Sequence, residues 1–116
     1  MPNTKSNFPV SVIKLSVLSP DLAPVNAEAL SVRLTLADSA VSGSGGGQYG
    51  IRPGHADAVM LLSQDGALSC VSSDPSAPAL KLRISGGFAR VGTLSDSVTG
   101  ERYTEVMIVT EKAEII

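Results

Sequence analysis

The chain has 116 residues and a formal net charge of −2, with 43% hydrophobic residues, 3% aromatic residues and no tryptophan. This length fits one domain, and its core must be built from Val, Leu, Ile and Ala, which favours β structure. The cationic residues are scattered through apolar stretches, which argues against nucleic acid and anionic membranes as partners, and a single cysteine excludes an internal disulfide and a cysteine zinc site.

A loose N-terminal tail, residues 1–9, is expected to precede one domain over residues 10–116. In VIKLSVL, residues 12–18, apolar and polar residues alternate with the period of a half-buried strand. The next stretch, SPDLAPVNAE, contains two prolines, and we expect a turn and a short edge strand there.

Strict alternation in LSVRLTL, residues 30–36, predicts a second strand whose apolar side chains share one face: Leu30, Val32, Leu34 and Leu36. We expect Leu34 and Leu82 to point into the core from facing strands. The following stretch, ADSAVSGSGGG at residues 37–47, carries little apolar side chain and is expected to be a flexible loop.

In the second half of the chain, Asp65 and Gly66 lie between two apolar runs, which is a strong hairpin signal. Cys70 lies within the second of these runs and is expected to be a buried, inert thiol. LKLRIS predicts another strand, and Gly86-Gly87 predicts a bend or bulge between it and FARV.

The last predicted strand is YTEVMIVTE, and only the final EKAEII has helix-like composition, over a length too short to stand alone. Eight to ten short strands without a credible helix predict an all-β sandwich or flattened barrel of antiparallel hairpins. No apolar run is long enough to span a membrane and no signal peptide is evident, so we expect an intracellular protein.

The sequence offers little sign of catalysis. Gly45, Gly47 and Gly50 match the dinucleotide-binding pattern, but Pro53 and Gly54 follow where that pattern needs a helix, so a mobile loop is the better interpretation. The single histidine, residue 55, has no recognisable nucleophile context. We therefore expect a binding module with no catalytic residue, metal or cofactor.

The segment GQYGIRPGHADAVMLL, residues 47–62, resembles the G-E-F-G-hydrophobic-x-P-G-H-A-P-hydrophobic segment of the epsilon subunit of F-type ATP synthases, called delta in mitochondria. Three further blocks resemble that family in order and spacing, and together they cover nearly the whole chain: IKLSVLSP, RISGGFARV and VMIVTEKAE. The sequence departs from the family pattern at Gln48, where an acidic residue is common, at Tyr49, where Phe is common, and at Asp57, which replaces Pro.

The resemblance implies a ten-stranded β-sandwich of two five-stranded sheets. It also implies a non-catalytic central-stalk (rotor) subunit that binds the gamma subunit and the c-ring and couples proton transport to ATP synthesis. The implied interface residues are Gln48, Tyr49, Ile51, Arg52 and His55. The implied structural turns are Pro53, Gly54, Gly86 and Gly87.

By the same resemblance, the protein would lie on the cytoplasmic face of the bacterial inner membrane, or on the inner face of an organellar energy-transducing membrane. It would be peripheral and would contact the membrane only through the c-ring. The C-terminal helical hairpin of many family members is expected to be absent. The alternative is a free-standing intracellular β-sandwich that acts as an adaptor or ligand-binding module.

Overall fold

The structure is a computed structural model that describes residues 10–37 and 47–116. These residues form strands and no helix, which confirms the all-β class. The predicted tail, residues 1–9, and nearly all of the predicted flexible loop lie outside the described residues. The strands are β1 (Ile13–Ser19), β2 (Leu22–Leu36), β3 (Gly47–Ile51), β4 (Ala58–Leu61), β5 (Gly66–Ser72), β6 (Leu80–Ser85), β7 (Phe88–Ser95), β8 (Arg102–Val109) and β9 (Lys112–Ile115).

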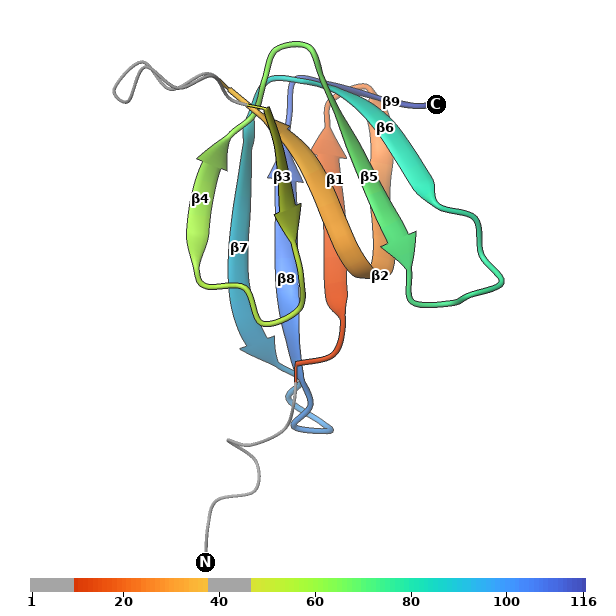
Figure 1. Ribbon diagram of the computed structural model, residues 1–116, viewed down its shortest axis with the longest axis vertical. Coiled ribbons are helices and arrows are strands. Elements are labelled where there is room, and N and C mark those ends of the chain that lie inside the picture. Colours follow the sequence, from red (N-terminus) through yellow and green to blue (C-terminus); the bar gives the residue numbers. More distant parts are fainter. Residues whose placement is uncertain (1–9, 38–46) are drawn as a thin grey trace, which may run out of the picture.

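Eight of the nine strands of the described residues form one hydrogen-bonded path in the order β4-β7-β8-β1-β2-β5-β6-β9, and the ninth, β3, pairs with β2 (Figure 1). The pair β1 and β8 is parallel, and the other pairs are antiparallel. We call β4, β7, β8 and β1 the first strand group, and β3, β5, β6 and β9 the second strand group. Strand β2 pairs with β1 through residues 22–29 and with β3 and β5 through residues 29–36, so it belongs to both groups.

The expected count of ten strands in two five-stranded sheets is not confirmed, because β2 is continuous over 15 residues. Instead of the expected turn and separate short edge strand, the structure has a two-residue turn at Pro20 and Asp21, and β2 begins directly after it. Pro24 lies inside β2, where the register with β1 shifts between Val17 and Ser19. Proline has no amide hydrogen for a ladder, and such an irregular position tolerates it.

A second register shift lies between Ala29 and Ser31 of β2. Before it, the inward positions carry odd numbers, as at the buried Ala29, and after it they carry even numbers, as at the buried Val32 and Leu34. Leu30 falls at the shift and is 47% exposed, so its predicted place on the buried face is wrong. A bulge adds one residue to a strand and exchanges its two faces.

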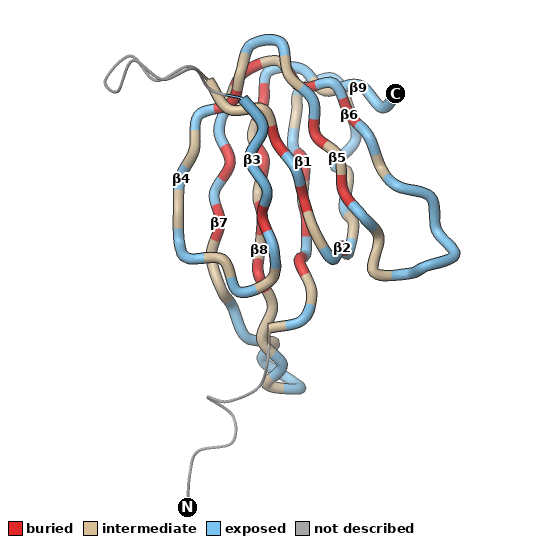
Figure 2. Tube along the Cα trace, viewed as in Figure 1, coloured by how far each residue is buried: buried red, intermediate tan, exposed pale blue. Residues whose placement is uncertain are grey.

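One apolar core joins the two strand groups, and buried residues alternate with exposed ones along the strands (Figure 2). Leu34 and Leu82 are both buried, as expected. They do not come from facing strands, however, because each lies opposite Leu68 of β5 in the same sheet. The large side chains with almost no exposed surface include Ile13, Leu15, Leu34, Ile51, Leu68, Leu82 and Ile108.

The prediction of a hairpin at Asp65-Gly66 is wrong, because β4 pairs with β7 while β5 pairs with β2 and β6. The connection instead carries the chain from the first strand group to the second, and the amide of Ser63 donates to the carbonyl of Thr35 at 3.0 Å. A Cβ at Gly66 would lie 2.7 Å from Cβ of Thr35. Close approach to β2, and not a hairpin turn, explains this glycine.

The bend expected at Gly86-Gly87 is present, and it returns the chain from β6 to β7 in the first strand group. Both glycines have positive φ, 69° and 97°. The hydroxyl of the buried Thr110 lies 3.0 and 2.7 Å from the carbonyl oxygens of Ser85 and Gly86, and its single proton is shared between these acceptors. The polar groups of this corner are therefore satisfied inside the protein.

The C-terminal EKAEII does not follow its helix-like composition. Residues Lys112–Ile115 form β9, which pairs with β6 from Leu82 to Ser85. The amide of Ile116 adds a hydrogen bond to the carbonyl of Lys81 at 3.0 Å. Pairing with a sheet edge outweighs the weak helix propensity of so short a segment.

Candidate functional site

The segment that carries the family resemblance forms an edge strand and a tight turn. Strand β3 pairs with the end of β2, and the amide of His55 donates to the carbonyl of Arg52 at 3.1 Å, which closes a turn through Pro53 and Gly54. Proline fixes one φ of this turn, and Gly54 supplies a φ of 88°. Local sequence therefore determines the position of His55.

A residue from the opposite strand group holds this turn in place. The amide of Gly54 donates to Oγ1 of Thr104 in β8 at 2.7 Å. Thr104 is one of only two buried polar residues in the described parts of the chain, and its own amide donates to the carbonyl of Val12 at 3.0 Å. The sequence analysis did not single out Thr104, although a polar residue at the inward position before Val106 and Ile108 was a detectable signal.

The ring of His55 is engaged at both nitrogens. Its Nδ1 lies 2.7 Å from the carbonyl oxygen of Ala56, and its Nε2 lies 2.7 Å from the hydroxyl of Tyr49. A carbonyl oxygen only accepts, so Nδ1 carries the proton of the neutral ring, and Nε2 accepts the hydroxyl proton of Tyr49. The two rings also meet edge to face, with centroids 5.6 Å apart.

Through these two contacts His55 links Tyr49 of β3 to the backbone of Ala56 after the turn, and we call this link the clasp. Among the residues that the structure describes, the ring of His55 contacts the phenol of Tyr49 and the backbone carbonyl of Ala56, and no serine, threonine or cysteine nucleophile and no orienting carboxylate. Within the described residues, no group of three His, Cys, Asp or Glu side chains could hold a metal ion. The contacts of His55 therefore order the turn and fix the position of the Tyr49 hydroxyl.

The other predicted interface residues separate into exposed and buried ones. Gln48 is exposed, and its Oε1 accepts a hydrogen bond from Arg33 at 3.4 Å. Arg52 is exposed at the end of β3. Ile51 is 0% exposed and packs in the core, because it lies opposite Val32 on the inward side of β3. Its side chain is therefore not available to a partner.

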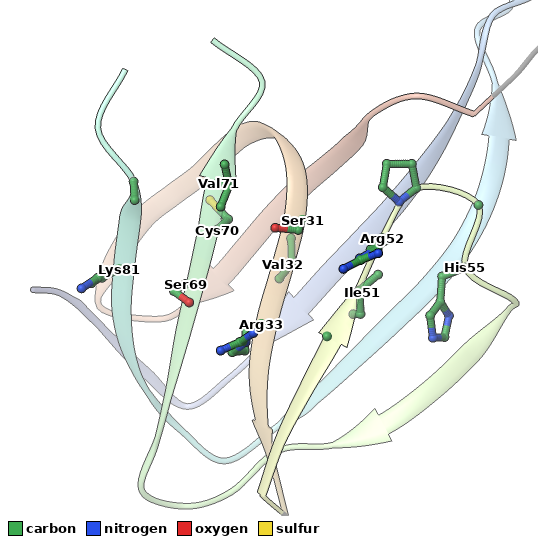
Figure 3. A pocket seen from close by; sticks show the side chains of 14 residues that line it. Ser31, Val32, Arg33, Ile51, Arg52, His55, Ser69, Cys70, Val71 and Lys81 are labelled. Atoms are coloured by element: carbon green, nitrogen blue, oxygen red, sulfur yellow. The ribbon is translucent and has the colours of Figure 1, made fainter. Parts of the chain in front are cut away.

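The outer side of the second strand group carries a groove next to this turn (Figure 3). Arg33 of β2, Ser69 of β5 and Lys81 of β6 lie in one cross-strand row, and Arg52 comes in from the end of β3. In the described part of the chain, the ion pairs are Arg83 with Glu114 and Arg90 with Glu105. The three cations that line the groove, Arg33, Arg52 and Lys81, thus have no acidic partner there.

The outer side of the first strand group is apolar along one row. Leu61 lies opposite Phe88, Phe88 lies opposite Val109, and Val109 lies opposite Leu18. Leu61 is 70% exposed, and both Phe88 and Leu18 are also exposed. We call these four residues the apolar row. An exposed row of large apolar side chains across four strands is typical of a protein–protein contact.

Comparisons with known proteins point to the fold. No family model and no curated protein sequence matches the chain. Among solved structures, a similar chain comes from the cryo-EM structure of the Tetrahymena thermophila mitochondrial ATP synthase, central stalk and c-ring, with a TM-score of 0.50 and 10% identity. The match covers 88% of this chain and 65% of that chain, so this chain spans just under two thirds of its neighbour's length. At this identity the likeness concerns the fold alone.

Proposed function

We propose that the protein is a non-catalytic rotor subunit of a proton-transporting ATP synthase, which binds the gamma subunit and the c-ring. The observation that carries the proposal is a fold likeness over 88% of the chain to a component of an ATP synthase central stalk and c-ring structure. The P-G-H-A segment supports it independently, because the residues that resemble the epsilon subunit family form an exposed turn beside an edge strand.

The c-ring contact is assigned to the turn and its edge strand, through Gln48, Tyr49, Arg52 and His55. These side chains are exposed or half-buried, and the turn is fixed by the hydrogen bond from Gly54 to Thr104. A turn that is already ordered loses little conformational entropy when it docks. Such a rigid contact suits a subunit that has to transmit torque.

The gamma contact is assigned to the apolar row. Burying Leu61 and Phe88 against the gamma subunit would remove apolar surface from water, which is the main driving force of stable association. The apolar row lies on the first strand group, whereas β3 pairs only with β2 at the border of the second group. One molecule could therefore hold two partners at once.

A peripheral place on an energy-transducing membrane follows from this proposal, with membrane contact only through the c-ring. No helix within the described residues is long and apolar enough to cross a membrane. The membrane could be the bacterial inner membrane, with the protein on its cytoplasmic face, or the membrane of an organelle.

The test is reconstitution with the gamma subunit and c-ring of the same organism's ATP synthase. We expect Leu61→Asp to abolish gamma binding and Arg52→Ala with His55→Ala to weaken c-ring binding. Val98→Asp is the matched control for the first variant, because Val98 is 91% exposed in the turn between β7 and β8. If the unaltered protein binds neither partner, the proposal fails and the free-standing adaptor takes its place.

A further inference from the structure

The cations that look scattered in the sequence converge on one face of the fold. Arg33, Arg52 and Lys81 line the groove on the outer side of β3, β2, β5 and β6 (Figure 3). We propose that this groove docks an extended acidic segment of a partner protein, whose carboxylates pair with these three side chains. The inference does not rest on the rotor role, because it is argued from charge and spacing, although it shares Arg52 with the proposed c-ring contact.

The spacing of the cations fits an extended chain. Arg33 lies opposite Ser69, and Ser69 lies opposite Lys81, so two strand spacings of about 4.8 Å separate Arg33 from Lys81. Arg52 lies two residues beyond Gly50, the partner of Arg33, which places it at a diagonal of about 7 Å. Alternate residues of an extended peptide are also about 7 Å apart. Two carboxylates of one acidic strand can therefore reach Arg33 and Arg52 together.

The groove leaves room for such a segment. Gly50 places no side chain between Arg33 and Arg52, and a Cβ built there would meet no atom within 4 Å. Ser31 and Ser69 line the groove with hydroxyl groups that can donate to carboxylates. All three cations are exposed, so their side chains can adjust to the ligand. The guanidinium groups favour bidentate contact with carboxylates.

Several features favour a protein segment over a polyphosphate ligand. The chain as a whole is acidic, at −2, which opposes any anionic ligand at long range and opposes a densely charged nucleic acid or vesicle surface more than a short acidic peptide. The groove also contains Val71, which is 54% exposed, and a phosphate compound would leave this apolar surface uncovered. A peptide brings carboxylates and apolar atoms together.

The counter-charges nearby leave the three cations available. Glu114 lies on the same outer side, but it pairs with Arg83 at 3.4 Å, which is one row further along the sheet. Gln48 contacts Arg33 only as a neutral acceptor, at 3.4 Å. The groove therefore keeps its positive charge within the described residues.

The experiment uses the full chain and a fluorescein-labelled peptide that alternates glutamate and threonine, with binding measured by fluorescence anisotropy at low salt. We expect saturable binding, no binding of the same peptide with glutamine for glutamate, and weakening as salt is added. Each of Arg33→Gln and Lys81→Gln should raise the Kd about two- to fivefold, and the double variant about tenfold, as expected for exposed ion pairs.

The matched control is the double variant Lys14→Gln with Arg90→Gln, which removes the same charge from the outer side of the first strand group. Circular dichroism has to show that both double variants are folded. The proposal is overturned if both double variants weaken binding equally, if the glutamine peptide binds as well, or if no binding is found. It is also overturned if pyrophosphate, a single-stranded RNA or phosphatidylserine vesicles compete with the peptide more strongly than unlabelled peptide does.

Discussion

Gly54 and Thr104 are fifty positions apart in the sequence, yet the amide of Gly54 donates to the hydroxyl of Thr104 at 2.7 Å. Thr104 is 0% exposed and belongs to β8, whereas Gly54 lies in the turn that follows β3. The bond therefore ties the turn that presents His55 to the core of the other strand group.

Removing the Thr104 hydroxyl should loosen this turn. Thr104→Val keeps the shape of the side chain and leaves the Gly54 amide without its partner, which should lower the free energy of unfolding by about 1–3 kcal/mol. Thr104→Ser keeps the hydroxyl and is the control. Urea unfolding gives the stability, and amide hydrogen exchange at Gly54 should accelerate in the valine variant only. Equal protection of Gly54 in both variants would show that the hydroxyl does not hold the turn.

The glycines with positive φ should differ sharply in their tolerance of alanine. Gly54 has φ of 88° and open space where alanine would place its Cβ, so Gly54→Ala should lower stability by the backbone strain alone, about 1–3 kcal/mol. At Gly87 a Cβ would overlap the carbonyl oxygen of Val109. Gly87→Ala should therefore be clearly more destabilising, with a larger drop in Tm. Similar melting of the two variants would contradict the packing at Gly87.

The bulge in β2 makes neighbouring leucines unequal. Leu34→Ala and Leu82→Ala remove buried side chains and should each lower the free energy of unfolding by about 2–5 kcal/mol. Leu30→Ala removes a side chain that is 47% exposed and should cost clearly less, although the sequence pattern treats Leu30 and Leu34 alike. Chemical denaturation of the three variants checks this order. A Leu30 variant as damaged as Leu34→Ala would place Leu30 in the core and remove the bulge.

The strands with clear alternation were predictable from the sequence, because burial of one face imposes the period directly. Residues 13–17 and 80–84 show this, and the bend at Gly86-Gly87 follows from local backbone freedom. The absence of a hairpin at Asp65-Gly66 was not predictable from local signals. A two-residue turn signal specifies a reversal, whereas the choice of partner strand depends on distant residues such as Thr35.

The candidate site also combines features that the local sequence predicts with features that depend on distant parts of the chain. The turn at Pro53-Gly54 and the exposure of Arg52 follow from the local sequence. The contact of Thr104 with Gly54 and the convergence of Arg33 with Lys81 depend on the strand order, which the sequence alone does not reveal. The burial of Ile51 depends on the register of β3 against β2, and a shift by one residue would have exposed it.

The thiol of Cys70 should be slow to react. Burial raises the pKa of this thiol above its usual range, although a hydrogen bond with the backbone of Leu80 opposes the shift. Since the thiolate is the nucleophile, alkylation by iodoacetamide near pH 8 should be slow in the folded protein and fast in urea. A pKa raised by folding gives stability that is complete below the pKa of the unfolded thiol and is lost as pH rises through the folded value. Rapid labelling of folded protein would contradict the burial.

The tautomer of His55 provides the most direct test of the clasp. Because the carbonyl of Ala56 can only accept, the neutral ring should carry its proton on Nδ1 and leave Nε2 as acceptor for Tyr49. Nitrogen-15 NMR of the imidazole above pH 8 distinguishes the two nitrogens. Tyr49→Phe removes the donor to Nε2 but leaves the Ala56 contact, so it should move the Nε2 resonance more than that of Nδ1. Because the hydrogen bond is exposed, this variant should lower stability by no more than about 1 kcal/mol. A proton found on Nε2 would mean that the ring does not bridge Tyr49 and Ala56, and the turn would then be held by the backbone hydrogen bond from His55 to Arg52 and by Thr104.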